Sequence, residues 1–260
     1  MSDNTPPKPL ALGVTYEKVV SLVQENLKTG KLLDCGSGSG ALSWRLKKAC
    51  RNIEVYSCDL FPEKFVVEEV ECLKADLNDS FPYPDRHFDM VCSVEVVEHL
   101  ENRFHFFREV NRILKPGGKF IFTTPNIMNI VSRLRFLLSG FYILFSPLDE
   151  RSDVTRHDHI NPITWYYYRY SLSKTGFTTD SISVDRWKKG AIAFAWLWPF
   201  MWLYTRRSLG KEKSPQLRKS NLSLVKDLVR FDLLFGRTAI FLARKIKNSE
   251  DDHYYDYSSS

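Results

Sequence analysis

The sequence predicts an α/β protein with a doubly wound, mostly parallel sheet in its first half. Short apolar runs that end in an acid or in a glycine-rich turn alternate with amphipathic segments, at the spacing of strand–helix–strand units. The run LKPGG then separates a helix from the next strand, because Pro116 cannot continue a helix and two glycines turn the chain. Together these observations favour parallel strands joined by helices.

The other elements follow in chain order. Apolar residues at helical spacing predict a first helix, and Gly30 is a suitable stop for it. Residues 130–145 form an apolar stretch punctuated by arginines, which predicts a helix interrupted at Gly140. Strands are expected at 31–35, 53–60, 70–76, 88–97, 119–126, 178–185 and 236–245, and helices at 16–27, 41–49 and 102–114.

The composition is that of a folded, cytoplasmic protein. With 260 residues, 43% of them hydrophobic and 26% charged, the chain can bury a substantial core. The five cysteines lack paired metal-type spacing, so we expect reduced, packed thiols. Residues 1–13 are polar and proline-rich, without the apolar segment of a signal peptide, and predict a flexible N-terminus. Residues 248–260 predict a disordered tail, which leaves one domain over 14–247.

Positive charge is concentrated in the C-terminal quarter of the chain. Residues 186–247 contain fifteen Lys or Arg and three acids, a net charge of +12, so the rest of the chain carries −6 of the total of +6. A nucleic acid, an anionic membrane surface or a phosphorylated substrate would each suit such a region.

Two apolar insertions, near 127–147 and 187–220, interrupt the α/β pattern. The run GAIAFAWLWPFMWLY (190–204) is shorter than the ~20 residues that span a bilayer, and Pro199 breaks it. A buried helix pair is one interpretation. Three tryptophans between Lys/Arg flanks support the other, a peripheral contact of 187–207 with an anionic membrane at its inner face. Sequence leaves the oligomeric state open.

A glycine-rich turn provides the clearest sign of a cofactor site. The run DCGSGSG follows the first expected strand, and its glycines let the backbone approach a ligand at a helix N-terminus. Its spacing is G-x-G-x-G, whereas a dinucleotide site more usually has G-x-G-x-x-G. Asp59 ends the second strand, where a carboxylate can accept hydrogen bonds from a ribose diol. Asp76, after the third strand, is placed to read an adenine amino group.

These runs resemble the class I S-adenosylmethionine-dependent methyltransferases. The matching segments are LLDCGSGSG, SCDL, KADLND, FPYPDRHFDMVCSVEVVEHL and FREVNRILKPGGKFIFTTPN, in the family's order over residues 31 to 126. The resemblance implies a doubly wound, mostly parallel seven-stranded Rossmann-like sheet with an antiparallel last strand, here with an apolar helical insertion.

The resemblance also implies a set of residues that bind S-adenosyl-L-methionine. The methionyl part would be held at the glycine turn, the ribose by the acid after the second strand and the adenine by the acid after the third. The expected cofactor-binding residues are Asp34, Gly36, Gly38, Gly40, Asp59, Asp76, Leu77 and Glu95.

The run EVVEH, which follows the fourth strand, is the candidate for chemistry. On a helix Glu95, Glu98 and His99 would share one face. Glu98 and His99 are the expected catalytic residues, with His99 or a neighbouring histidine as the base. Two carboxylates and an imidazole also suit Mg²⁺, Mn²⁺ or Fe²⁺, and His159 or His157 in RHDHINP can supply a fourth ligand. Two interpretations stay open: these residues bind a divalent metal, with Mg²⁺ as the first candidate, or they line the pocket without a metal.

The acceptor is expected to be a hydroxyl group, which must be positioned and deprotonated. The layout resembles methyltransferases of cell-surface glycan biosynthesis, through TPN, the long apolar insert, HINP, an aromatic helix and a T-G-F turn. A sugar or glycan hydroxyl, lipid-linked in one version, is therefore the leading expectation. The E-x-x-E-H run also resembles ubiquinone-pathway O-methyltransferases, which methylate prenylated catechols, and small-RNA 3′-terminal 2′-O-methyltransferases. We do not expect a nucleic acid partner, because single-strand recognition uses aromatic stacking in a basic groove.

Overall fold

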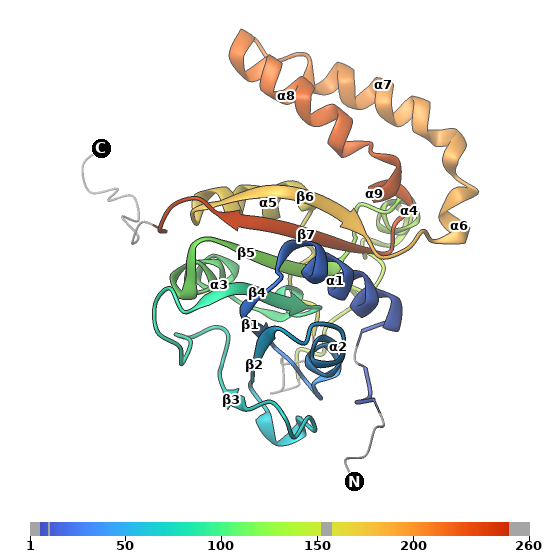
Figure 1. Ribbon diagram of the computed structural model, residues 1–260. Helices are drawn as coiled ribbons and strands as arrows, with labels where there is room; N and C mark the ends of the chain where they lie inside the picture. The colour runs from blue at the N-terminus through green and yellow to red at the C-terminus, as the bar shows by residue number, and fades with distance from the viewer. Residues whose placement is uncertain (1–5, 10, 152–157, 250–260) are drawn as a thin grey trace.

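The computed structural model describes residues 6–9, 11–151 and 158–249 (Figure 1). These residues form a seven-stranded sheet in the order β3-β2-β1-β4-β5-β7-β6. The first five strands pair in parallel, and β7 is antiparallel to both β5 and β6. The expected α/β class and seven-stranded sheet are therefore confirmed.

Most expected strands and helices form within two residues of their predicted ends. The strands are β1 (Gly30–Cys35), β2 (Ile53–Asp59), β3 (Cys72–Lys74), β4 (Phe88–Val94), β5 (Leu114–Pro125), β6 (Phe177–Val184) and β7 (Thr238–Lys245). The α-helices are α1 (Gly13–Asn26), α2 (Ala41–Ala49), α3 (Arg103–Ile113), α4 (Ile130–Ser139), α5 (Trp165–Lys174), α6 (Lys189–Ile192), α7 (Trp198–Leu209), α8 (Pro215–Leu228) and α9 (Phe231–Phe235). Short 3₁₀ turns are η1 (Pro62–Lys64), η2 (Val97–His99) and η3 (Ala195–Leu197).

Helices cover both faces of the sheet, as the near-continuous apolar strands require. Apolar residues of α1 and α2 pack on one face, and those of α3 and α5 pack on the other. The second face contains an aromatic layer in which the rings of Phe122 and Phe241 stack with centroids 4.5 Å apart. The contact between two buried aromatic rings stabilises the fold beyond the stabilisation that comes from removing their surface from water.

Three details differ from expectation. Strand β5 begins at Leu114, so the LKPGG run that was expected to separate it from the preceding helix lies within the strand, where the pairing with β4 is irregular. Helix α3 begins at Arg103, and the EVVEH run contains only the single turn η2, so the predicted helical convergence of its side chains is wrong. Glu95 has φ +55°, a left-handed conformation that cannot belong to a right-handed helix. Pro199 stands in the first turn of α7, where its missing N–H needs no partner, so it begins a helix instead of breaking one.

The segment between β6 and β7 forms a helical arm, α6 to α8, that projects from the sheet (Figure 1). Its inner side joins α4 and α9 in a third apolar cluster. Within the described ranges, none of the helices combines the length and the apolarity needed to cross a bilayer.

Candidate functional site

The residues singled out from the sequence meet at one edge of the sheet. In this order of parallel strands, β1 and β4 are neighbours whose connections leave in opposite directions. Ligands of open α/β sheets bind in the crevice at such a point, beyond the carboxyl ends of the strands. The glycine loop follows β1, Asp59 ends β2, and the EVVEH run follows β4.

The glycine loop and the EVVEH run are packed directly against each other. Gly36, Gly38 and Gly40 all have positive φ, which only glycine adopts without strain. A Cβ atom on Gly36 would lie 2.5 Å from Val96 Cγ2 and 3.5 Å from Leu77 Cδ1. A larger residue at this position would therefore push apart the two halves of the site.

Asp59 holds the glycine loop through backbone hydrogen bonds. Its Oδ2 accepts from the N–H of Gly38 at 2.8 Å, and its Oδ1 accepts from the N–H of Phe61 at 2.9 Å. The carboxylate is thus fixed beside the loop, where a ribose diol would meet it. The side chain of Asp76 accepts from Asn78, whose amide oxygen accepts from the N–H of Glu101 beyond η2.

Asp34 is almost fully buried and faces helix α2. Its Oδ2 accepts from the N–H and the hydroxyl of Ser43, at 3.1 and 2.6 Å. Burial raises the pKa of Asp34 to about 7, although the Ser43 hydrogen bonds oppose this. In this arrangement Asp34 fixes the turn between β1 and α2. Its contact with the methionyl part of a cofactor stays a prediction.

The chain near the N-terminus reaches the same loop. The hydroxyl of Ser39 donates to the carbonyl oxygen of Lys8 at 2.7 Å, and the N–H of Val66 donates to the carbonyl oxygen of Ser39 at 3.2 Å. Residues from two other parts of the chain thus border the glycine loop.

Glu95 is held by the end of the neighbouring strand β5. The hydroxyl of Thr123 accepts from the N–H of Glu95 at 3.0 Å and donates to its Oε1 at 3.1 Å. Burial raises the pKa of Glu95 to about 7, partly offset by Thr123 and by the positive charge of Arg237. Neither Thr123 nor Arg237 was singled out from the sequence; TTPN at a strand end was the available signal for the threonine.

Glu98 is a fully buried carboxylate, and neither of its oxygens has a hydrogen-bond partner within 3.5 Å among the described residues. Burial, followed by repulsion from Glu95, raises its pKa well above the usual range, although the nearby hydroxyl of Thr124 opposes this. An unsatisfied buried polar group costs roughly 1–3 kcal/mol, so its presence calls for a functional explanation.

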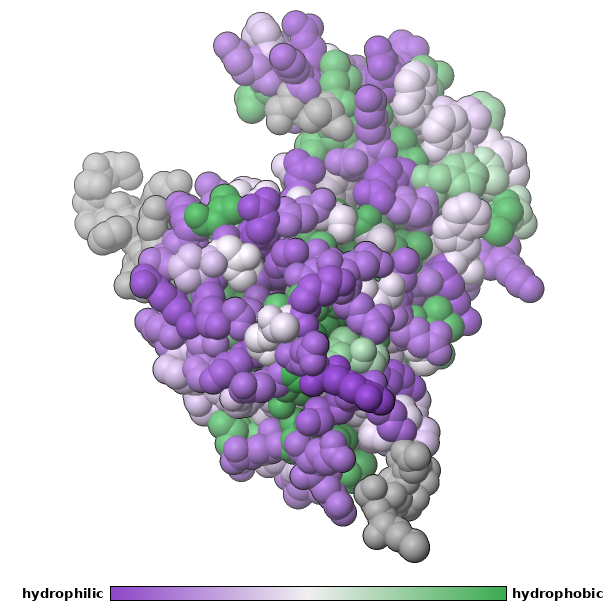
Figure 2. All heavy atoms as spheres, viewed as in Figure 1, coloured by the Kyte–Doolittle hydropathy of each residue, from purple (hydrophilic) through white to green (hydrophobic). Residues whose placement is uncertain are grey.

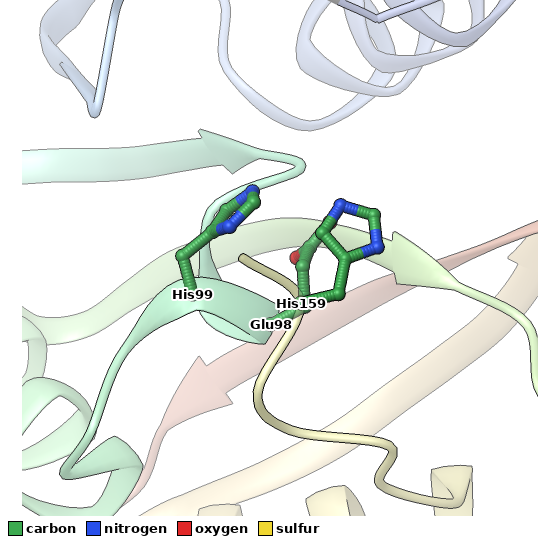
Figure 3. A group of neighbouring side chains, drawn as sticks. All are labelled: Glu98, His99 and His159. Atoms are coloured by element: carbon green, nitrogen blue, oxygen red, sulfur yellow. The ribbon is translucent and has the colours of Figure 1, made fainter. Parts of the chain in front are cut away.

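His99 and His159 stand beside Glu98 (Figure 3). His99 Nδ1 lies 2.9 Å from the carbonyl oxygen of Asp158, and because a carbonyl only accepts, Nδ1 carries the proton. Nε2 is then the ring nitrogen that can accept a proton when the ring is neutral. The two imidazole rings meet edge to face with centroids 4.7 Å apart. Burial lowers the pKa of His159, which favours its neutral form.

The HINP segment is fastened to the η2 turn by its backbone. The N–H groups of Ile160 and Asn161 both donate to the carbonyl oxygen of Glu98, at 2.9 and 3.0 Å. The side chain of Asn161 donates to the carbonyl oxygen of Leu100. This attachment places His159 beside His99 although sixty positions separate them in sequence, and no sequence pattern indicated the role of Asn161.

Three of the four predicted metal ligands are therefore grouped. One ligand atom from each of Glu98, His99 and His159 lies within 4.8 Å of the other two. Glu95 is outside this group, because its carboxylate is turned toward Thr123. His157 lies outside the described residues.

The fold and the glycine loop are typical of α/β proteins that bind a nucleoside-type cofactor at the carboxyl edge of the sheet. Residues 33–122 match the family model described as a methyltransferase domain. A structure of an S-adenosylmethionine-dependent methyltransferase from Archaeoglobus fulgidus has the same fold, with a TM-score of 0.54, 19% identity, and coverage of 88% of this chain and 94% of that one. Residues 33–122 are thus similar to a methyltransferase domain, and the described chain has the fold of an S-adenosylmethionine-dependent methyltransferase.

Relatives of known name match parts of the chain. The 27-O-demethylrifamycin SV methyltransferase of Amycolatopsis mediterranei is 30% identical over 99 residues, which are 34% of this chain and 36% of that protein. The ubiquinone biosynthesis O-methyltransferase of Pseudomonas syringae is 30% identical over 131 residues, 46% of this chain and 54% of that protein. The chain thus spans less than two thirds of the length of these relatives.

Proposed function

We propose that this protein transfers a methyl group from S-adenosylmethionine to a hydroxyl oxygen. The observation that carries the proposal is the contact between Gly36 and Val96, which joins the cofactor loop to the turn that bears Glu98 and His99. A methyl donor at the loop would therefore lie next to a basic imidazole. Two relatives named ubiquinone biosynthesis O-methyltransferase, and one named 27-O-demethylrifamycin SV methyltransferase, support oxygen as the accepting atom.

The proposed reaction is a direct displacement. The glycine loop and Asp59 would hold the cofactor, whose sulfonium would supply the methyl group beside the η2 turn. His99 Nε2 takes the proton of the acceptor hydroxyl as the oxygen attacks. The new O–CH₃ bond forms while the S–CH₃ bond breaks, and the products are the methyl ether, S-adenosylhomocysteine and protonated His99. The hydrogen bond from Nδ1–H to Asp158 holds the ring in the required tautomer.

A sugar or glycan hydroxyl, presented on a lipid carrier, is the acceptor that we favour. The basic, tryptophan-containing arm beside the site suits a phosphate-bearing lipid-linked sugar. A prenylated catechol is the second candidate, favoured by the ubiquinone biosynthesis relatives. An RNA 3′ end is the third, favoured only by the positive charge of the C-terminal quarter.

Labelled S-adenosylmethionine distinguishes the three acceptors. The intact protein is incubated with prenyl-phosphate-linked sugars, with prenylated catechols and with RNA 3′ ends. We expect the label in the sugar fraction, as an ether methyl that mild base does not release. If the label appears only in the catechol or only in RNA, that molecule is the acceptor and the glycan assignment is wrong. Methylation of nitrogen or carbon in all active fractions would contradict hydroxyl transfer itself.

A divalent cation fits the cluster of Glu98, His99 and His159. Glu98 offers two oxygens without a described partner, and imidazole and carboxylate ligands together suit Mg²⁺, Mn²⁺ or Fe²⁺. These three residues would hold the ion, and its chemistry would be to lower the pKa of a bound hydroxyl and to orient it. His99 would then act as a ligand instead of a base, so both uses make it essential.

Mn²⁺ binding tests the cluster without requiring turnover. Glu98→Gln keeps the size of the side chain but removes its anionic oxygen, so we expect the Kd for Mn²⁺ to rise at least about tenfold, measured by electron paramagnetic resonance. Glu101→Gln, at an exposed acid just beyond the turn, is the matched control and should leave the Kd unchanged. Equal Kd values for Glu98→Gln and wild type, or no Mn²⁺ binding at all, would refute metal binding by this cluster.

A further inference from the structure

The helical arm exposes a continuous apolar stripe. Within α7, Phe200, Leu203 and Tyr204 share one side, because the second and third lie three and four positions after the first. Two further members precede them on α6 and η3, and the ring of Trp196 contacts that of Phe200 with centroids 6.5 Å apart. We call Ile192, Trp196, Phe200, Leu203 and Tyr204 the outer stripe; 44%, 64%, 65%, 49% and 75% of their surfaces are exposed. Figure 2 shows apolar side chains on the outer side of this part of the molecule, at the upper right.

The opposite side of the same helices is partly buried. Leu197, Trp198, Met201 and Trp202 pack toward α8 and the third apolar cluster. The indole N–H of Trp198 donates to the carbonyl oxygen of Val229 at 2.9 Å, which fixes the rotation of α7. Because this contact turns the inner side toward the body, the outer stripe is left facing solvent. Exposed apolar groups in a contiguous row are typical of an interaction surface.

Positive charge borders the outer stripe. Exposed basic residues occupy the last turn of α7, the turn after it and the start of α8, and none of them forms an ion pair with a described residue: Arg206, Arg207, Lys211, Lys213, Arg218 and Lys219. Glu212 is the one acid among residues 189–226. Aromatic and aliphatic side chains next to cations without an ion-pair partner suit a surface that has an apolar interior beneath anionic groups.

The arm leaves the sheet at the edge that carries the candidate site. Strand β6 runs parallel to β5 and ends at this edge, and β7 begins there, with the N–H of Thr238 donating to Asp185 at 3.0 Å. Helix α4 also follows β5 at this edge and contacts α6. Near its end Leu137 and Leu138 are 77% and 86% exposed, which adds a second apolar projection.

We propose that the arm is a membrane-docking surface, with the outer stripe inserted among lipid chains and the basic residues on anionic headgroups. Charge complementarity favours a lipid surface over a second copy of the chain, since two such arms would bring like charges together. A docked arm would bring the carboxyl edge of the sheet close to the lipid surface. This inference is independent of methyl transfer, because it concerns binding alone.

Vesicle binding of the full-length protein, without cofactor or acceptor, tests the surface. The probes are phosphatidylcholine vesicles with and without phosphatidylglycerol, in a flotation assay. We expect binding to the mixed vesicles and little to pure phosphatidylcholine. Trp196→Ser with Phe200→Ser should weaken the partition coefficient by roughly tenfold or more. Arg206→Gln and Arg207→Gln should each weaken it by about fivefold, with the loss disappearing at high salt.

Matched controls separate docking from general surface effects. Tyr170→Ser on α5 and Ile246→Ser after β7 alter residues that are 48% and 60% exposed, and both should bind vesicles as wild type does. Circular dichroism checks that each variant is folded. Absence of wild-type binding, or equal binding by the Trp196→Ser/Phe200→Ser variant, would overturn the proposal. So would a dimer in sedimentation that the stripe variant splits and that does not float with vesicles.

Discussion

Alanine in place of His99 is expected to lower kcat by roughly 10²–10⁴-fold and to leave the affinity for S-adenosylmethionine unchanged. The reason is that our proposal assigns His99 to the acceptor side of the site, beside Glu98 and His159, whereas Asp59 holds the glycine loop. Single-turnover kinetics with saturating cofactor measures the first effect, and calorimetric titration measures the second.

A second histidine provides the control. His87→Ala removes an imidazole from the amino end of β4, the opposite end of the strand from the η2 turn, and should change neither kcat nor cofactor affinity. An unchanged kcat in His99→Ala would remove His99 from the mechanism, as base and as metal ligand alike.

Replacing Asp59 by asparagine is expected to weaken cofactor binding by roughly 30- to 150-fold, equivalent to about 2–3 kcal/mol. Both oxygens of the carboxylate accept backbone N–H groups, and asparagine has one oxygen in place of two. The glycine loop would lose a fixed contact at Gly38, and the ribose would lose its anionic acceptor. Competition with a fluorescent cofactor analogue gives the Kd.

Asp79→Asn is the matched control, because it removes one exposed carboxylate at the same edge without an Asp59-type contact to the glycine loop. It should bind S-adenosylmethionine as wild type does. If Asp59→Asn also keeps wild-type affinity, the ribose contact assigned to this residue is wrong, whatever the chemistry of the acceptor side.

The sheet was predictable because each of its strands has a pattern that can be recognised in a short stretch of sequence. A buried parallel strand is an apolar run, and the run that ends at Cys35 can be identified without knowledge of its neighbours. The first-turn position of Pro199 was misread because proline stops a helix in its interior but suits its first turn. The distinction depends on where the helix begins, which the apolar run alone did not indicate.

The acceptor side of the site was predictable only in part. Glu98, His99 and His159 were identified from their residue types, yet their convergence does not follow from helical spacing. It depends on the left-handed backbone at Glu95 and on the two hydrogen bonds that fasten residues 160 and 161 to the carbonyl oxygen of Glu98. Those contacts are made between backbone groups far apart in sequence, which side-chain patterns do not encode.

The central claim is that the carboxyl edge of this sheet binds S-adenosylmethionine. Calorimetric titration of the cofactor into the intact protein tests it most directly. We expect saturable binding of one cofactor per chain, lost or strongly weakened in Asp59→Asn and retained in His99→Ala. No detectable binding to the folded wild-type protein, by calorimetry or by a shift in its thermal unfolding, would contradict the claim.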